Sequence, residues 1–268
     1  MSCNSELLQG RLAQAQRLWL FLDYDGTLAD FAPTPEHVEP DPEIISLLGR
    51  LAKHPRMRVA VVSGRRLDHV ATLVPVPGLL LAGTYGVELQ TFEGQRVERV
   101  PYQAIRPTLD TLKPRWERLI ADRQGFFLED KGWALALHAR FAEDGQAQKV
   151  LEDARQEAVR FLDEGQLRLL GGHKFLEIGP QAANKGLTVA YLLGRYSWPG
   201  ALPLYLGDDD KDEEAFAVIK TCKGLAIVVA PEPRETQADC RLGSPQDARD
   251  WLRVLLARFD RRQRSPHD

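Results

Sequence analysis

The sequence predicts a doubly wound α/β fold with a mostly parallel sheet, interrupted by an inserted α+β domain. Two observations predict the sheet: short apolar runs without polar alternation recur along the chain, and several of them end in Asp, Ser or Gly. Unbroken apolar runs are typical of parallel strands that are covered on both faces. A third observation predicts the insertion, because the middle of the chain changes to a helix–hairpin–helix–hairpin pattern.

The length and composition are those of an ordinary folded protein. The 268 residues are 44% hydrophobic and 27% charged, which suits one large domain or two smaller ones. The formal net charge of −3 gives no basic footprint for nucleic acid, and the apolar run at 18–22 is too short to span a membrane. Because Cys3, Cys222 and Cys240 have no short paired spacing, we expect no zinc site, no disulfide framework and a cytoplasmic location. We also expect a monomer.

The two flanks of the chain supply the elements of the predicted sheet. Asp41 and Pro42 begin a helix that extends to about residue 53, because Asp is a favourable N-cap and Pro fits the first helical turn. Asn184 is placed to cap a second helix in the same way. The predicted strands are 18–22, 58–62, 79–82, 202–206 and 225–229, with a hairpin at 88–100; the predicted helices are 6–16, 42–53, 184–193, 213–219 and 247–259.

The middle of the chain is predicted to form a separate cap domain. Pro and Gly cluster at 101–107 and at 179–184, so we place the core domain at 1–102 and 183–268 and the cap at 103–182. The chain crosses between the two domains twice, which predicts a hinge. Within the cap, the predicted helices are 103–122 and 146–162, and the predicted strands are 126–129, 133–140, 166–170 and 174–178.

The first strand ends in an acidic pair. Asp23 and Asp25 are one residue apart, and residues i and i+2 of an extended chain point the same way, so both carboxylates can face one pocket. Two neighbouring carboxylates repel each other unless a proton or a cation lies between them, and hard oxygen ligands suit Mg2+. The alternative interpretation is a solvated, Asp-rich turn.

Three further strand or helix ends carry polar groups. Ser63 and Arg65 follow the strand at 58–62, where a hydroxyl and backbone N–H groups form an anion site. Lys185 stands in the first turn of a helix, where a cation is disfavoured unless it holds an anion. A second acidic cluster follows the strand at 202–206 and comprises Asp208, Asp209 and Asp212. A nucleophile, a metal and cationic phosphate ligands are what phosphoryl transfer requires.

These motifs resemble those of the haloacid dehalogenase superfamily of phosphatases. The resemblance rests on Asp23-Tyr24-Asp25-Gly26-Thr27, Ser63, Lys185, and Gly207-Asp208-Asp209 with Asp212. It implies a Rossmann-like core in which Asp23 attacks phosphorus, Asp25 acts as general acid and base, and Ser63 and Lys185 hold phosphate oxygens. It also implies Mg2+ bound by Asp23, the Asp25 backbone carbonyl and Asp208, with Asp209 and Asp212 orienting metal-bound waters.

Within that superfamily the sequence is most similar to the trehalose-6-phosphate phosphatase family. The blocks that carry this similarity are Val62-Ser63-Gly64-Arg65, Glu129-Asp130-Lys131-Gly132, His138-Ala139-Arg140, Lys174-Phe175-Leu176-Glu177 and the acidic run from Gly207 to Glu213. The resemblance implies a sugar phosphate substrate that is bound by Arg65, Glu129, Lys131, Arg140, Lys174 and Glu177. The chain departs from the family pattern at Tyr85 and Val87, where His and Ala are usual, and at Lys211, where Thr is usual.

Other interpretations stay open. A phosphoacceptor signalling domain also has acidic strand ends, a hydroxyl residue and a lysine, although the insertion and Asp25 argue against it. A sugar-binding regulator would keep the fold and lose turnover. Within the enzyme interpretation, the substrate could be another phosphorylated disaccharide or a glycosyl-phosphoglycerate. The charged residues of the cap could also be the solvated side of an open sheet.

Overall fold

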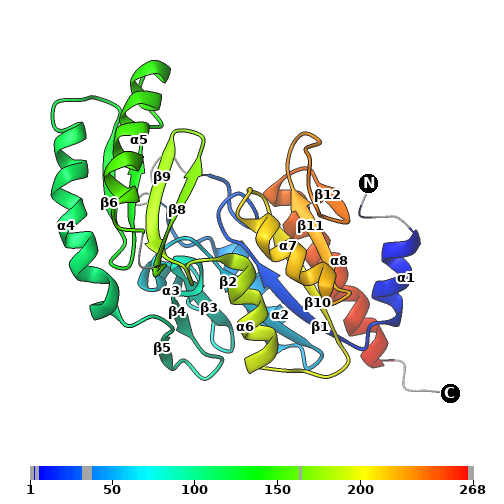
Figure 1. Ribbon diagram of the computed structural model, residues 1–268. Helices are drawn as coiled ribbons and strands as arrows, with labels where there is room; N and C mark the ends of the chain where they lie inside the picture. The colour runs from blue at the N-terminus through cyan, green and yellow to red at the C-terminus, as the bar shows by residue number, and fades with distance from the viewer. Residues whose placement is uncertain (1–2, 4–5, 32–37, 163–164, 265–268) are drawn as a thin grey trace. The chain divides into compact units, whose positions relative to one another are not determined.

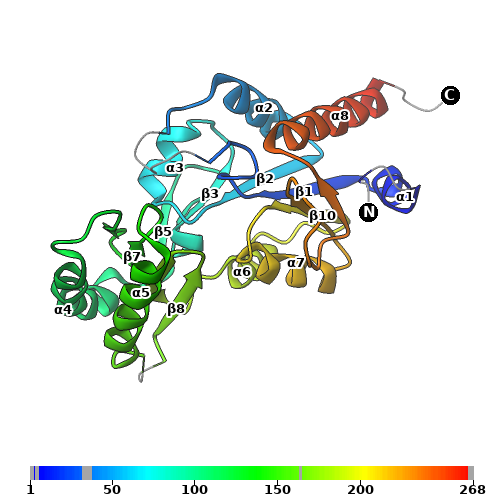
Figure 2. The same ribbon diagram turned by 90° about the horizontal axis from the view of Figure 1, so that it is seen from above.

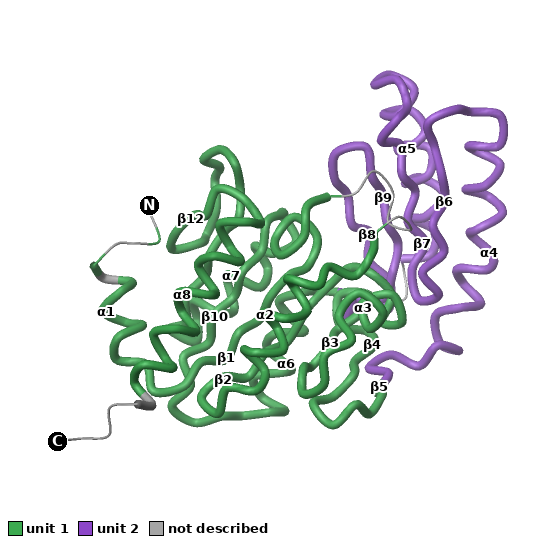
Figure 3. The backbone as a smooth tube through the Cα atoms, turned by 180° about the vertical axis from the view of Figure 1, so that it is seen from behind, with its two compact units in different colours: residues 1–97, 184–268 green, residues 98–183 purple. Residues whose placement is uncertain are grey.

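The computed structural model describes residues 3, 6–31, 38–162 and 165–264. The chain divides into two compact units, residues 1–97 with 184–268 and residues 98–183, which Figure 3 shows in different colours. The domain junctions expected from the sequence, between 102 and 103 and between 182 and 183, lie five residues after the first division and one residue before the second. The central segment is therefore an insertion into a unit that is discontinuous in sequence.

The first unit contains an eight-stranded sheet in the order β12-β11-β10-β1-β2-β3-β4-β5. Its strands are β1 (Arg17–Leu22), β2 (Met57–Val62), β3 (Leu80–Gly83), β4 (Glu88–Gln90), β5 (Arg96–Glu98), β10 (Ala201–Gly207), β11 (Leu225–Val229) and β12 (Cys240–Leu242). The pairs from β12 to β3 are parallel, and β4 is antiparallel to β3. The strand order changes direction at β1, and the carboxyl ends of strands at such a switch point are where this class of sheet binds ligands.

Helices cover both faces of this sheet (Figure 2). In β1, Leu18, Leu20 and Leu22 belong to the hydrophobic cluster on one face, whereas Trp19 and Phe21 belong to the cluster on the other. Every side chain of the strand after Arg17 is buried, which explains the unbroken apolar run. The helices on the first face are α1 (Glu6–Gln14), α2 (Pro42–Lys53), α3 (Leu67–Leu73) and α8 (Pro245–Arg264), and those on the second are α6 (Lys185–Arg195) and α7 (Asp212–Thr221).

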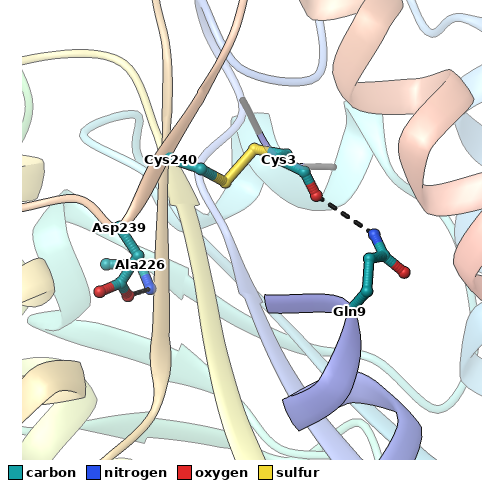
Figure 4. Close-up of a disulfide and its surroundings, with 5 residues drawn as sticks. All are labelled: Cys3, Gln9, Ala226, Asp239 and Cys240. Carbon is teal, nitrogen blue, oxygen red and sulfur yellow. Dashed lines mark hydrogen bonds between the residues drawn. A yellow bond between two sulfur atoms is a disulfide. The ribbon is translucent and has the colours of Figure 1, made fainter. Parts of the chain in front are cut away.

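The expectation of no disulfide was wrong. Cys3 and Cys240 form a disulfide between the amino-terminal segment and β12 (Figure 4), whereas Cys222 is free and exposed. The two bonded residues are 237 positions apart, so no local cysteine spacing could reveal the bond. Strand β12 was not predicted either, because it is only three residues long. Because the protein contains a disulfide, the lack of short cysteine spacings no longer supports a reducing compartment.

The second unit is an antiparallel sheet, β6-β7-β9-β8, with two helices packed against it (Figure 1). Its elements are α4 (Tyr102–Ile120), β6 (Phe127–Asp130), β7 (Leu135–His138), α5 (Asp144–Val159), β8 (Leu167–Gly172) and β9 (Phe175–Pro180). The indole N–H of Trp116 in α4 donates to the Ala154 carbonyl of α5 at 3.0 Å, which joins the two helices. Among the described helices of the chain, none is long and apolar enough to cross a membrane.

Candidate active site

Asp23 lies at the carboxyl end of β1, between the ends of β2 and β10. Its backbone N–H donates to the Leu206 carbonyl at 2.9 Å, which continues the pairing with β10 past the end of β1. The residue is 4% exposed, and one carboxylate oxygen lies 3.0 Å from the Lys185 ammonium nitrogen. The central strand therefore delivers a buried carboxylate directly against a buried cation.

Asp208, which follows β10, lies beside Asp23. Single carboxylate oxygens of Asp23, Asp208 and Asp212 all lie within 4.8 Å of one another. The Thr27 hydroxyl donates to Asp208 Oδ1 at 3.2 Å. Gly26 has φ +76°, and a Cβ atom there would lie 2.3 Å from Asp208 Oδ2, so only glycine allows this close approach of carboxylate and backbone. The two acidic clusters predicted from the sequence thus meet at one place.

The electrostatics of this cluster favour a bound cation. Burial raises the pKa of Asp23 well above its usual value, against the lowering effect of Lys185, and burial with the charge of Asp212 raises the pKa of Asp208 to about 7. These raised pKa values mean that the carboxyl groups hold a proton at pH values at which an exposed Asp is ionised. A divalent metal ion would replace that proton, and the hard oxygen donors present here fit Mg2+. The residues present therefore fit the metal that the family resemblance implies.

Asp212 has both carboxylate oxygens occupied by hydrogen bonds. Oδ1 accepts from Lys185 Nζ at 2.7 Å and from the Tyr205 hydroxyl at 2.6 Å. Oδ2 accepts from the backbone N–H groups of Asp208 and Asp209, both at 3.0 Å. Asp212 therefore holds the acidic loop and Lys185 in a fixed relation, which is a different contribution from that of a metal ligand.

Asp209 stabilises the start of α7. Its Oδ1 accepts from the backbone N–H groups of Lys211 at 2.9 Å and Asp212 at 3.2 Å. Burial raises the pKa of Asp209, but the charges of Lys185 and Lys211 outweigh that effect and lower the value to about 2. Arg234, for which no sequence pattern predicted a role, donates to the Asp209 carbonyl at 3.2 Å and to Glu213 at 2.7 Å. Asp209 is thus ionised, and hydrogen bonds hold both its side chain and its backbone carbonyl.

The second carboxylate of the first motif, Asp25, is held by Arg65. The guanidinium donates through Nε and Nη2 to the two carboxylate oxygens, each at 2.6 Å, and His69 contacts the Nη1 of the same Arg65. Ser63 is buried at the end of β2, and its hydroxyl accepts from the backbone N–H of Arg65 at 3.1 Å. Arg65, which was predicted to bind substrate, therefore contacts Asp25, the predicted general acid.

In the second unit, Glu129, Lys131 and Glu177 share one face of the sheet. Glu129 and Glu177 are both register partners of Ala136, so they lie in one row across β6, β7 and β9. Lys131 Nζ lies 2.8 Å from Glu177 Oε2 and 3.9 Å from Glu129. Glu177 is fully buried, and its Oε1 has no hydrogen-bond partner in the described parts of the chain. This row therefore contains side chains of both signs of charge and one carboxylate oxygen that is left to accept a further hydrogen bond.

A second row on the same face is aromatic, and none of its members was among the predicted substrate contacts, although His138 and Phe175 stand in the blocks that carry the family resemblance. The rings of Phe127 and His138 are stacked with centroids 4.2 Å apart, and Phe175 meets His138 edge-on at 5.2 Å. His138 Nε2 also lies 3.0 Å from Glu129 Oε2, which joins the two rows. In the sequence, Phe127 and Phe175 cannot be distinguished from core residues, because an apolar residue in a strand gives the same pattern whichever face of the sheet it lies on.

Two other cap residues, Lys174 and Arg140, were also predicted to bind substrate. Lys174 occupies the turn between β8 and β9 with φ +53°, where its ammonium group contacts the Ala142 carbonyl at 2.7 Å and Asp144 at 2.6 Å. Arg140 follows β7 and is exposed. Of the five predicted cap residues, Glu129, Lys131 and Glu177 are the three whose distances from one another are given above.

Tyr85 and Lys211, two residues that depart from the family pattern, contact each other. The Lys211 ammonium lies 5.4 Å from the centroid of the Tyr85 ring, which is a cation–π distance. Tyr85 has φ +55°, and its hydroxyl and ring would lie only 2.7 Å from a Cβ atom at position 64. The tyrosine and the lysine thus form a pair beside Asp209.

Comparisons with known proteins agree with this geometry. The family model described as trehalose-phosphatase matches residues 21–246. A probable trehalose-phosphate phosphatase of Sinorhizobium fredii is 34% identical over 96% of this chain and 97% of its own length. The trehalose-6-phosphate phosphatase of Escherichia coli is 30% identical over 93% of this chain and 90% of its own.

A solved structure also has the same fold. The carboxy-terminal domain of a trehalose-6-phosphate phosphatase from C. albicans superposes with a TM-score of 0.83, at 20% identity, over 96% of this chain and 97% of that one. The family model covers both motif-bearing flanks and the insertion between them. The chain therefore belongs to the trehalose-phosphatase family, whose members are phosphatases with the haloacid dehalogenase fold.

Proposed function

We propose that this chain is a Mg2+-dependent phosphatase that hydrolyses trehalose 6-phosphate to trehalose and phosphate. The observation that carries the proposal is the meeting of Asp23, Asp208 and Lys185 at the carboxyl ends of adjacent parallel strands and the start of α6. Uncatalysed hydrolysis of phosphate monoesters is among the slowest reactions known, so a nucleophile, a cation and a metal must act together.

The proposed reaction has two steps, both at Asp23. A carboxylate oxygen of Asp23 attacks phosphorus and the bond from phosphorus to the sugar oxygen breaks, while Asp25 gives its proton to that oxygen. Asp25 then takes a proton from water, whose oxygen attacks the phosphoaspartate and releases phosphate with the carboxylate restored. Ser63 and Lys185 hold the phosphate oxygens, and Arg65 orients the Asp25 carboxyl group through its two hydrogen bonds.

Asp23, Asp208 and the Asp25 backbone carbonyl are the proposed Mg2+ ligands. The metal would supply positive charge that offsets the repulsion between carboxylates and phosphate. Asp209 and Asp212 support this site from outside: Asp212 by holding the backbone of the acidic loop, and Asp209 by fixing the start of α7.

Metal-free protein should lose stability as the pH rises from about 5 to about 8. The pKa of Asp208 is raised to about 7 by burial and the Asp212 charge, so the folded state holds a proton that the unfolded state has already lost. Stability is then full below the unfolded pKa of about 4 and falls as the pH rises through the folded value. Urea unfolding in a chelator and in Mg2+ at both pH values measures the effect, and Mg2+ should stabilise more at the higher pH. Equal stabilisation by Mg2+ at the two pH values would contradict the assigned site.

The sugar is proposed to bind at the charged row of the second unit. Glu129, Lys131 and Glu177 offer charge-assisted hydrogen bonds to hydroxyl groups, and the unsatisfied Oε1 of Glu177 is an acceptor for one of them. Arg140 and Lys174 stay predicted substrate contacts. The second unit then acts as the specificity domain that recognises the sugar.

Replacing Glu177 by Gln should raise the KM for trehalose 6-phosphate and leave small substrates unaffected. The amide is isosteric but loses the charge that strengthens hydrogen bonds to Lys131 and to a sugar hydroxyl, which predicts a fall in kcat/KM of about 10- to 100-fold. Steady-state kinetics with trehalose 6-phosphate and with p-nitrophenyl phosphate measure the difference. Equal losses on both substrates would contradict a role in sugar recognition.

The decisive experiment is phosphate release from a panel of substrates, in Mg2+ and in a chelator. The panel is trehalose 6-phosphate, sucrose 6-phosphate, glucose 6-phosphate and glucosyl-3-phosphoglycerate. A preference for trehalose 6-phosphate by orders of magnitude in kcat/KM, lost on chelation, supports the proposal. A preference for another member keeps the chemistry and changes the substrate, and binding without turnover of any member favours the regulator. Cytoplasmic location and a monomeric state stay predictions.

A further inference from the structure

Tyr205 contacts the acidic cluster from inside the sheet. It lies in β10, is fully buried, and its ring packs edge-on against Phe216 of α7 with centroids 5.7 Å apart. Its hydroxyl donates to Asp212 Oδ1 at 2.6 Å. The ring is therefore held by the hydrophobic core, and the polar end is directed at one carboxylate of the site.

Asp212 transmits this contact to both halves of the site. The oxygen that accepts from Tyr205 also accepts from Lys185, whose ammonium nitrogen lies 3.0 Å from Asp23. The other oxygen of Asp212 accepts the two backbone N–H groups that orient the acidic loop. A rotation of the Asp212 carboxylate would therefore move Lys185 and Asp208 together.

We propose that Tyr205 is a positioning residue that acts through Asp212. By donating the fourth hydrogen bond to this buried carboxylate, the hydroxyl fixes its rotation, so that Lys185 faces Asp23 and the loop presents Asp208 to the metal. Tyr205 also shares Oδ1 with Lys185, which leaves the lysine less tightly bound to Asp212 and available to a phosphate oxygen. The inference rests on the proposed metal-dependent phosphatase activity.

The test is the Tyr205→Phe variant, with Tyr196→Phe as matched control. Tyr196 packs against the same hydrophobic cluster as Tyr205, and its ring meets Phe92 edge-on with centroids 5.5 Å apart. It directly follows α6, and none of its described contacts is with an acidic residue of the site. The Tyr205 variant should bind Mg2+ about 10- to 100-fold more weakly by calorimetry and lose kcat to a similar extent, with a nearly unchanged KM, because such losses are typical when hydrogen bonds that orient a metal site from outside are removed. The control should keep the values of the unaltered protein. Mg2+ affinity and kcat within about twofold of that protein would overturn the proposal, as would a variant that unfolds in chelator.

A double-mutant cycle separates positioning from general packing. In an Asp212→Asn background, Tyr205→Phe should cost no further Mg2+ affinity, because the hydroxyl would act only through the carboxylate that is already lost. A full, additive cost in that background would overturn the proposal. Since calorimetry measures metal binding without turnover, absence of phosphatase activity in the unaltered protein would count against the proposed function and leave this inference testable.

Discussion

Replacing Asp23 by Asn is expected to reduce phosphate release by about 10⁴-fold or more, as is typical when a catalytic nucleophile is removed. The amide nitrogen and oxygen have the size of the carboxylate but cannot form the phosphoaspartate. The fold should survive, and the thermal midpoint in a chelator should stay equal or rise. Burial raises the pKa of Asp23 well above its usual value, so the ionised group opposes folding near neutral pH. Steady-state phosphate release and thermal unfolding measure the two effects.

The matched control for this variant is Asp210→Asn. Asp210 lies in the same acidic run, and its side chain is 97% exposed and ion-paired with Arg234 at 3.1 Å. The substitution removes the same charge from the same neighbourhood without touching the Asp23–Asp208–Lys185 cluster. Activity should be nearly unchanged, because exposed ion pairs contribute little. Substantial turnover by Asp23→Asn would refute the nucleophile assignment. An equal loss of activity in the control would show that the loss comes from the change in local charge and not from the missing nucleophile.

The core of the site could be predicted because the fold leaves it little freedom. A strand such as β1, buried on both faces, must be apolar throughout, so the polar residues that follow it mark its carboxyl end. Parallel neighbours then bring their carboxyl ends to one edge, and Asp23 and Asp208 meet there. The register is fixed by the same pattern, with Leu22 opposite Leu206. Periodicity and strand order thus suffice to bring the two acidic clusters together.

The hydrogen-bond partners of each carboxylate could not be predicted in this way. Asp212 is one of several acidic residues in its run, and nothing in the sequence shows that both its oxygens are occupied while Asp210 is exposed. The pairing of Asp25 with Arg65 depends on rotamers, as does the contact of Lys174 with Asp144. The contacts of side chains depend on distances of a few tenths of an ångström, which sequence spacing does not carry.

Replacing Lys185 by Met should destabilise the protein by about 3 kcal/mol or more and abolish turnover. Lys185 is buried, and its ammonium lies 2.7 Å from Asp212 and 3.0 Å from Asp23, so its removal leaves uncompensated buried charge. Protonation of the carboxylates relieves that charge, and the deficit should therefore grow as the pH rises from about 5 to about 8. Urea unfolding at both pH values in a chelator measures it, and Mg2+ should restore part of the loss. The Lys211→Met control removes a partly exposed cation 3.9 Å from Asp209 and should cost less than about 1 kcal/mol. A deficit independent of pH, or equal in the control, would show that the carboxylates do not depend on Lys185 for their charge balance.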